Sequence, residues 1–203
     1  MKSKFLKICR RRISRPGVDK LLAWLEDETD FFTAPASTKY HGSYEGGLLD
    51  HSLNVYSRLM EIAERDLLPL DSVGCHIGSL SPEEAETVVV LALLHDVCKV
   101  NTYKREMGRR KVEGTRNQWE DAEIFVANDT LPLGHGEKSL YLIQKHMDLF
   151  DDEAMAIRWH MGAYDYAARG GSYVLNNAMK ATPWVWRLHE ADMCATHIDE
   201  RED

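Results

Sequence analysis

The longest unbroken aliphatic run in the chain ends directly at two titratable residues. Residues 88–94 are apolar on every side, so a helix that carries them must be buried all round. His95 and Asp96 follow at once. A buried carboxylate is costly unless hydrogen bonds or a cation compensate it. The pair therefore indicates either a structural His–Asp hydrogen bond or a divalent metal, because adjacent helical side chains, about 100° apart, can straddle one ion.

The helix that carries this run has a well-marked start. Ser81 is a natural N-cap, Pro82 stands at the first helical position and Glu84 completes a capping box, and we expect the helix to end near Lys99. Residues 101–128 mix strand formers with turn-forming glycines and an asparagine, which predicts a β-hairpin or an irregular flap. Apolar periodicity predicts further helices at 18–26, 48–63, 136–150, 152–161 and 173–200, the last with a break near Pro183.

The predicted fold class is all-α, a compact helical bundle with a small β-hairpin or flap insertion near 101–128. At 203 residues, with 44% hydrophobic and 29% charged residues, the chain fits one structural domain with a buried core. Within it, residues 1–39 are expected to form a basic N-terminal arm and a short helix, and residues 40–203 the main domain.

The basic residues at the start of the chain contrast with an acidic whole. Residues 1–20 hold eight Lys and Arg against one acidic residue, whereas the net charge of the chain is −8. An acidic body disfavours general coating by nucleic acid, because the phosphate backbone requires clustered cations. The basic segment is therefore either a solvated terminus or a contact for an anionic partner.

Other features of the sequence indicate the cellular location of the protein. No apolar run approaches the ~20 residues of a membrane span, and residues 1–20 lack the long apolar stretch of a secretory signal. The four cysteines are scattered without a C-x-x-C pair, which argues against a disulfide framework. We expect a cytoplasmic protein that does not enter a membrane.

Polar residues with ligating side chains recur on the other predicted helices. His51 lies on an amphipathic helix, His135 at a helix start between two glycines, and His160 in the last turn of another helix, and Asp192 lies late in the chain. Taken alone, each is more simply explained as a structural residue with satisfied hydrogen bonds than as a metal ligand. Because all of them are flanked by core-type residues on separate helices, we expect them to converge with the 95–96 pair.

The order of these residues resembles the HD superfamily of metal-dependent phosphohydrolases. The local motifs are G-L-L-D-H-S at 47–52 and A-L-L-H-D-V-C-K at 92–99, and the resemblance extends over residues 40 to 197. It implies that one metal is held by His51, His95, Asp96 and Asp192. It also implies a second metal, held by His135 and His160 with Asp96 bridging. The mixed imidazole and carboxylate ligands suit one or two divalent ions of Mn, Fe, Co, Ni, Zn or Mg.

The resemblance implies hydrolysis of a phosphate ester by a metal-activated water. The residues expected to take part in catalysis are Asp96, Lys99, His135 and His160. Lys99, three residues beyond Asp96 on the same face, either contacts the phosphate or complements the helix dipole. Cys98 stands where the usual motif has glycine, and we expect it to keep the turn helical without touching the metal. His189 is a candidate outer partner of the centre.

The expected substrate is a small anionic molecule, either a nucleotide or a short oligonucleotide. Six Lys and Arg between 104 and 116 make the flap basic, so it either focuses anions over the centre or is a solvated surface. The chain also resembles the HD domain of bacterial 3′–5′ exoribonucleases, but about forty residues precede it here, too few for the OB-fold of that family. The alternatives are a non-catalytic nucleotide-sensing or nucleic-acid-binding module, and a di-iron HD oxygenase.

Overall fold

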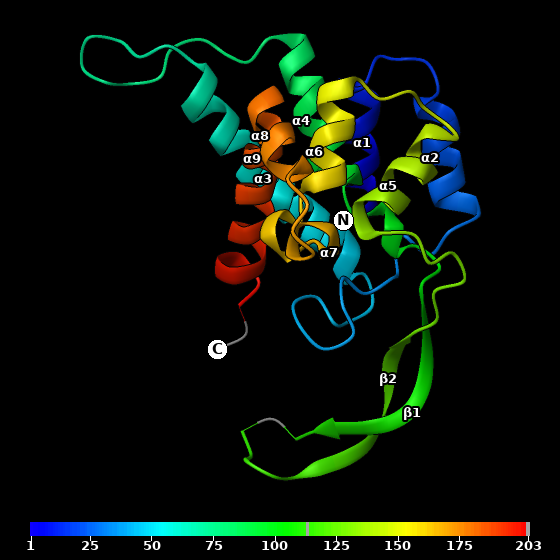
Figure 1. Ribbon diagram of the computed structural model, residues 1–203. Helices are drawn as coiled ribbons and strands as arrows, with labels where there is room; N and C mark the ends of the chain where they lie inside the picture. The colour runs from blue at the N-terminus through cyan, green and yellow to red at the C-terminus, as the bar shows by residue number, and fades with distance from the viewer. Residues whose placement is uncertain (113, 202–203) are drawn as a thin grey trace.

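The computed structural model describes residues 1–112 and 114–201, and nine α-helices and one two-stranded sheet form in that part of the chain (Figure 1). The helices are α1 Lys2–Arg12, α2 Val18–Asp27, α3 Gly47–Leu67, α4 Pro82–Leu94, α5 His135–Gln144, α6 Asp151–Trp159, α7 Tyr166–Arg169, α8 Val174–Ala181 and α9 Trp184–Cys194. The strands are β1 Tyr103–Lys111 and β2 Trp119–Ala127. Short 3-10 turns at Val97–Lys99 and Gly162–Tyr164 and a π turn at Ala195–Asp199 complete the described elements.

Helix α4 is the centre of the molecule. Its predicted capping box is present, because Ser81 Oγ accepts from the Glu84 N–H while the Glu84 carboxylate accepts from the Ser81 N–H. Every residue from 88 to 94 is fully buried, and α1, α3 and α6 pack against the helix. The helix ends at Leu94 and not near Lys99 as predicted, because a 3-10 turn at Val97–Lys99 follows it, and Asp96 lies in the wall of a cavity.

The basic N-terminal segment is part of the folded body. Helix α1 buries Phe5, Leu6 and Cys9 in the core and leaves its basic residues in solvent. Beyond it, Arg15 binds Glu86 of α4 and Glu153 of α6, with N–O distances of 2.7 and 2.5 Å. The segment that we expected as an arm therefore ties together two core helices.

The all-α class is wrong. The chain is 54% helical but also carries an antiparallel sheet in which Tyr103 pairs with Ala127 and Lys111 with Trp119, over nine residue pairs. The position of the insertion agrees with the strand-forming residues at 101–128. Most of its side chains are exposed, so the sheet contributes little to the buried apolar pattern from which a fold class is predicted.

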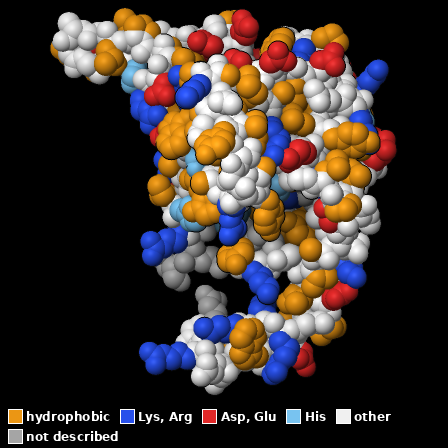
Figure 2. All heavy atoms as spheres, viewed as in Figure 1, with side chains coloured by type: hydrophobic (Ala, Val, Ile, Leu, Met, Phe, Trp, Pro, Cys, Tyr) orange, Lys and Arg blue, Asp and Glu red, His pale blue; other side chains and the backbone are white. Residues whose placement is uncertain are grey.

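The hairpin extends away from the helical body (Figure 1). Figure 1 shows β1 and β2 running together to a distant tip, and Figure 2 shows Lys and Arg side chains gathered on that projection. Of the two strands, only Tyr103, at the base, lines the cavity beside Asp96. Of the two alternatives for the basic hairpin, a cover that focuses anions or a solvated surface, its mostly exposed side chains favour the solvated surface. No helix among the described residues is long and apolar enough to cross a membrane.

Candidate metal centre

The six predicted ligand residues meet at the C-terminal end of α4. Helix α3 supplies His51, the end of α4 supplies His95 and Asp96, α5 begins at His135, His160 follows α6, and α9 supplies Asp192. All but His135 are buried, and the His135 side chain is 32% exposed. The cluster depends on tertiary packing because its members come from five separate segments.

The Asp96 carboxylate is shared by four histidines. Its Oδ2 lies 3.6 Å from His51 Nε2 and 3.7 Å from His95 Nε2. Its Oδ1 lies 2.7 Å from His135 Nε2 and 3.6 Å from His160 Nε2. The two oxygens thus face two different pairs of imidazoles, which is the arrangement a bridging carboxylate needs.

Three of the imidazoles carry a buried nitrogen without a hydrogen-bond partner. These atoms are the Nε2 atoms of His51, His95 and His160. The opposite nitrogens are engaged, because Nδ1 of His95 donates to the Ala92 carbonyl at 2.9 Å and Nδ1 of His160 to the Ile157 carbonyl at 2.7 Å. The Nε2 lone pairs of these two rings therefore point into the cluster. Native proteins rarely leave buried polar atoms unpaired, and a cation would satisfy all three atoms.

The cluster contains several sets of side chains that could hold a metal ion. Within each set the candidate ligand atoms lie within 4.8 Å of one another. In the part of the chain that the structure describes, the sets are His51 with His95 and Asp96, His95 with His160 and Asp192, Asp96 with Cys98 and His135, and His41 with His51 and Glu200. The residues present thus fit a divalent cation, and its identity is open among the ions that imidazole and carboxylate favour.

The candidate groups divide the two histidines predicted to hold a second metal. His135 Nε2 and His160 Nε2 both face Asp96 Oδ1, and His160 also groups with His95 and Asp192. His135 groups instead with Asp96 and Cys98, whose Sγ lies 3.3 Å from His135 Nδ1. Helix α5 begins against the 3-10 turn that carries Cys98, so this thiol contacts a predicted ligand rather than standing apart from the centre.

Lys99 contacts the centre directly. Its Nζ lies 2.5 Å from Asp96 Oδ2, and the side chain borders the cavity. Burial opposes the lysine charge, but the Asp96 carboxylate outweighs burial and raises the pKa of Lys99. Lys99 is therefore a permanent cation placed between a candidate ligand and the open space where a substrate would sit.

The electrostatic environment shifts the pKa values of the imidazoles in different directions. Burial lowers the pKa of His95 to about 3, so His95 is neutral, the form that binds metals. Burial also acts on His51, but Asp192 and Glu200 outweigh it and raise the pKa of His51 to about 9. Burial disfavours the charge on Asp192, yet His51 holds the pKa of that carboxyl well below its usual range.

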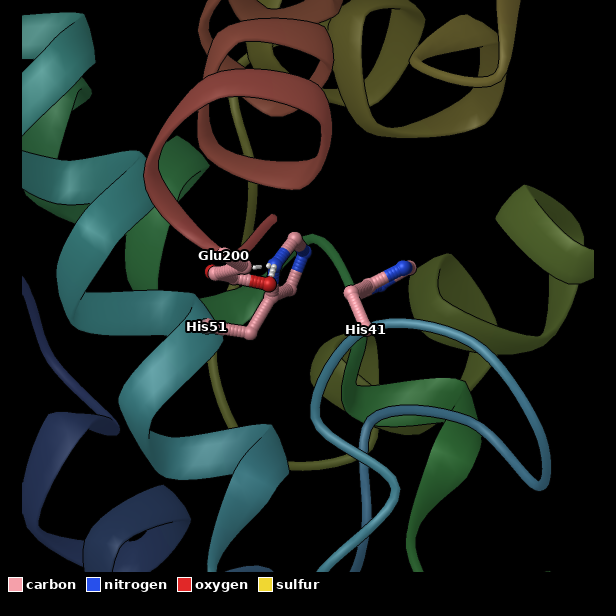
Figure 3. A group of neighbouring side chains, drawn as sticks. All are labelled: His41, His51 and Glu200. Atoms are coloured by element: carbon pink, nitrogen blue, oxygen red, sulfur yellow. Dashed lines mark hydrogen bonds and ion pairs between the residues drawn. The ribbon is translucent and has the colours of Figure 1, made fainter. Parts of the chain in front are cut away.

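Glu200 is a contributor that the sequence analysis missed. Figure 3 shows it beside His51, whose Nδ1 donates to both carboxylate oxygens at 3.1 Å. This contact turns His51 Nε2 toward Asp96 and Asp192, as carboxylates do behind metal-binding histidines. No local pattern marks Glu200, because the π turn at Ala195–Asp199 decides where it lies.

His41, which a loop brings to the same place, is the third side chain in Figure 3. Its ring centroid lies 4.9 Å from that of His51, and its Nε2 is buried without a partner. Burial and the neighbouring His51 lower the pKa of His41 to about 4. A neutral imidazole therefore borders the centre from the side of the loop.

His189 supports the centre through the backbone. Its Nδ1 donates to the His160 carbonyl at 2.7 Å, so His189 fixes the turn after α6. Among the described residues, this backbone contact is its link to the predicted ligands. Arg158 binds Glu137 and Asp165 near the start of α5. It thereby links the segments that carry His135 and His160.

A cavity of about 830 Å³ opens onto the cluster. Asp96, His135 and Asp192 lie in its wall. The other polar and aromatic residues of the wall include three cations and three tyrosines: Lys39, Lys99, Arg201, Tyr40, Tyr103 and Tyr164. Its size falls within the range of small-molecule sites, roughly 300–1,000 Å³.

The site is a buried histidine–carboxylate cluster beside an open cavity. A helical body with a projecting hairpin carries it. A family model described as "Putative helicase" (TraI_2) matches residues 15–128, more than half of the chain. The chain belongs to this family. The match includes His51, His95, Asp96 and the hairpin, and ends before His135. No curated protein and no solved structure gives a significant match to the chain.

The family description does not by itself define a motor activity for these residues. The sequence contains no G-x-x-x-x-G-K-[ST] motif, the phosphate-binding loop of P-loop nucleoside triphosphatases. The conspicuous chemistry within the matched range is instead the cluster around His51, His95 and Asp96.

Proposed function

We propose that this protein is a metal-dependent phosphohydrolase of the HD superfamily, acting on a phosphate ester of a nucleotide or short oligonucleotide. The observation that carries the proposal is the pair of buried, unpartnered Nε2 atoms on His95 and His160, which face the Asp96 carboxylate together with His51 Nε2, itself 3.3 Å from Asp192 Oδ1. Independent structural histidines would have hydrogen-bond partners of their own.

Different residues have different roles in such a reaction. A divalent cation supplies a Lewis acid and lowers the pKa of a water toward neutrality. His51, His95, Asp96 and Asp192 would hold it, which the two candidate groups that include them support, and Glu200 keeps the His51 ring in its orientation. Lys99 directs a positive charge to the cavity wall, where it can neutralise a phosphoryl oxygen.

The cavity wall supports an anionic, aromatic substrate. Lys39 and Arg201 add cations near Lys99, while Tyr40 and Tyr103 present rings on which a base can stack. A nucleotide combines a phosphate with such a base. We therefore expect turnover of nucleoside phosphates or oligonucleotide ends to exceed that of a simple alkyl phosphate.

The test combines metal analysis with a phosphatase and phosphodiesterase screen. Purified protein should contain a divalent metal and cleave a phosphate ester with at least one of Mn, Fe, Co, Ni, Zn or Mg. Asp96→Ala should lower the rate by more than about 100-fold, since losing even an outer partner of a metal ligand costs about 10–100-fold. Asp121→Ala, on the exposed hairpin strand β2, is the matched control and should keep the wild-type rate. Absence of cleavage with every cation, or a wild-type rate in folded Asp96→Ala, would refute the proposal.

A second candidate function is a nucleic-acid-binding module without turnover. It is favoured by the projecting hairpin, whose tip carries Arg109, Arg110 and Lys111, and by the family description. The same Asp96→Ala variant separates the two functions. A binding module would bind an oligonucleotide equally well in wild type and variant, with no product formed by either.

A further inference from the structure

Cys98 is held in a defined position beside the candidate centre. It lies in the 3-10 turn Val97–Lys99 and is 3% exposed. Its N–H donates to Ser139 Oγ at 3.1 Å, and its carbonyl accepts from Thr102 Oγ1 at 3.0 Å. Because contacts on both sides fix its backbone, the direction of the thiol is set by the fold.

The thiol and two neighbouring side chains have the spacing of metal ligands. Cys98 Sγ lies 3.7 Å from His135 Nε2. In a tetrahedral zinc site, Zn–S of about 2.3 Å and Zn–N of about 2.0–2.1 Å separate the two ligand atoms by about 3.5 Å. Asp96 Oδ1 completes the group; it lies 2.7 Å from His135 Nε2, a direct hydrogen-bond distance that an ion bound between them would lengthen, and the ligand atoms of all three residues lie within 4.8 Å of one another.

A second observation points to a cation on the same side of Asp96. His160 Nε2 is buried, has no hydrogen-bond partner and lies 3.6 Å from Asp96 Oδ1. Asp96 Oδ2 faces His51, His95 and Lys99 instead. Oδ1 faces His135 and His160, so the two oxygens can serve two different ions.

We propose that Cys98 is a thiolate ligand of a second cation, together with His135 and Asp96, with His160 at its edge. The inference rests on the proposed metal centre and extends it. Binding expels the thiol proton to water, since the thiolate is the ligand form of cysteine. A soft sulfur ligand selects zinc over Mg or Mn at this position, whereas the His51 and His95 side keeps only nitrogen and oxygen ligands.

X-ray absorption of the zinc-loaded full chain tests this proposal without relying on activity. With two zinc ions bound per chain, the coordination shell of zinc in the wild type should contain sulfur at about 2.3 Å besides nitrogen and oxygen at about 2.0–2.1 Å. Cys98→Ser should lose the sulfur component and bind its second ion more than about 100-fold more weakly. Cys75→Ser is the matched control, because Cys75 is exposed in the loop between α3 and α4 and should leave the shell unchanged.

The outcomes separate this inference from the proposed function. Zinc bound through nitrogen and oxygen alone in the wild type overturns the Cys98 ligand and leaves the centre standing. No zinc or other cation bound at all overturns both. A sulfur shell that persists in Cys98→Ser assigns the sulfur to another cysteine and also overturns the inference. The wild-type spectrum decides the first two cases even where the variant does not fold.

Discussion

The chemistry of single residues at the centre depends on partners that lie outside the ligand set. His51 can present Nε2 to the cluster only because Glu200 holds Nδ1, and His95 and His160 rely on backbone carbonyls for the same purpose. A ring held from behind loses little rotational freedom when it binds an ion. The orientation of these rings is thus part of the site before any cation arrives.

Replacing Glu200 tests this support. Glu200→Gln removes the charge that accepts from His51 Nδ1 but keeps the shape, and we expect metal affinity to fall by about 10–100-fold. Calorimetric titration of the ion-free protein measures the change. Glu190→Gln, on α9 and paired with Arg65 away from the centre, should leave affinity unaltered. Equal affinities for wild type and Glu200→Gln would show that the carboxylate does not position the ring.

At the scale of elements, close helix contacts bring the ligands together. Helix α5 approaches α6 at Gly136, where an added Cβ would lie 2.2 Å from the Arg158 carbonyl oxygen. This approach brings His135 Nε2 and His160 Nε2 within 3.6 Å of the same carboxylate oxygen, Asp96 Oδ1. A larger residue at 136 cannot be accommodated unless the two helices separate.

We therefore expect Gly136→Ala to affect both stability and the centre. Overpacking against backbone costs about 1–3 kcal/mol, so the free energy of unfolding should fall by that amount, and affinity for the second ion should weaken as His135 moves. Denaturant titration and metal titration measure the two effects. Gly170→Ala, at the end of α7, meets nothing closer than 3.2 Å and is the control. Wild-type stability in Gly136→Ala would contradict the tight approach.

The ion pairs of Arg15 connect elements on the opposite side of the core. Arg15→Ala leaves the buried Glu153 carboxylate without its bidentate partner, so we expect a loss of about 3 kcal/mol in the free energy of unfolding. Thermal or denaturant unfolding measures it. Arg11→Ala, on the exposed side of α1, should change stability by less than about 0.5 kcal/mol.

The same ion pairs have a defined pH dependence. Burial opposes the charge of Glu86, but Arg15 and Ser14 outweigh it and lower the pKa of Glu86 below its ordinary value of 4.5. A lowered carboxyl pKa contributes stability that is complete above 4.5 and is lost as pH falls through the folded-state pKa. Arg15→Ala should therefore flatten the decline of the melting temperature in acid. Parallel curves for the two proteins would exclude this contribution.

At the scale of the whole molecule, the tip of the hairpin and the cavity are separate surfaces. The tip of the hairpin lies far from the helical body, while its base at Tyr103 borders the cavity (Figure 1). A ligand that extends from the cavity along the hairpin would contact both. A small phosphate ester would contact the cavity alone.

Neutralising the hairpin tip distinguishes these cases. Replacing Arg109, Arg110 and Lys111 with Gln should weaken oligonucleotide binding and lower the salt dependence by about 2–3 in the slope of log K against log[salt]. Hydrolysis of a small ester should not change. The same exchange at Arg10, Arg11 and Arg12 of α1 controls for general charge. An unchanged salt slope in the hairpin variant would remove the tip from nucleic-acid binding.

The sequence by itself determined the local elements. The capping box at Ser81, the break near Pro183 and the hairpin within 101–128 all agree with the structure, because caps, apolar periodicity and turn residues act over a few neighbouring positions. The helix predicted to end near Lys99 ends at Leu94 instead. Tertiary structure alone decided that the basic N-terminal segment packs as α1, that only the base of the hairpin lines the cavity, and that Cys98 and Glu200 reach the centre. These features depend on contacts between residues far apart in the chain, which no local pattern encodes.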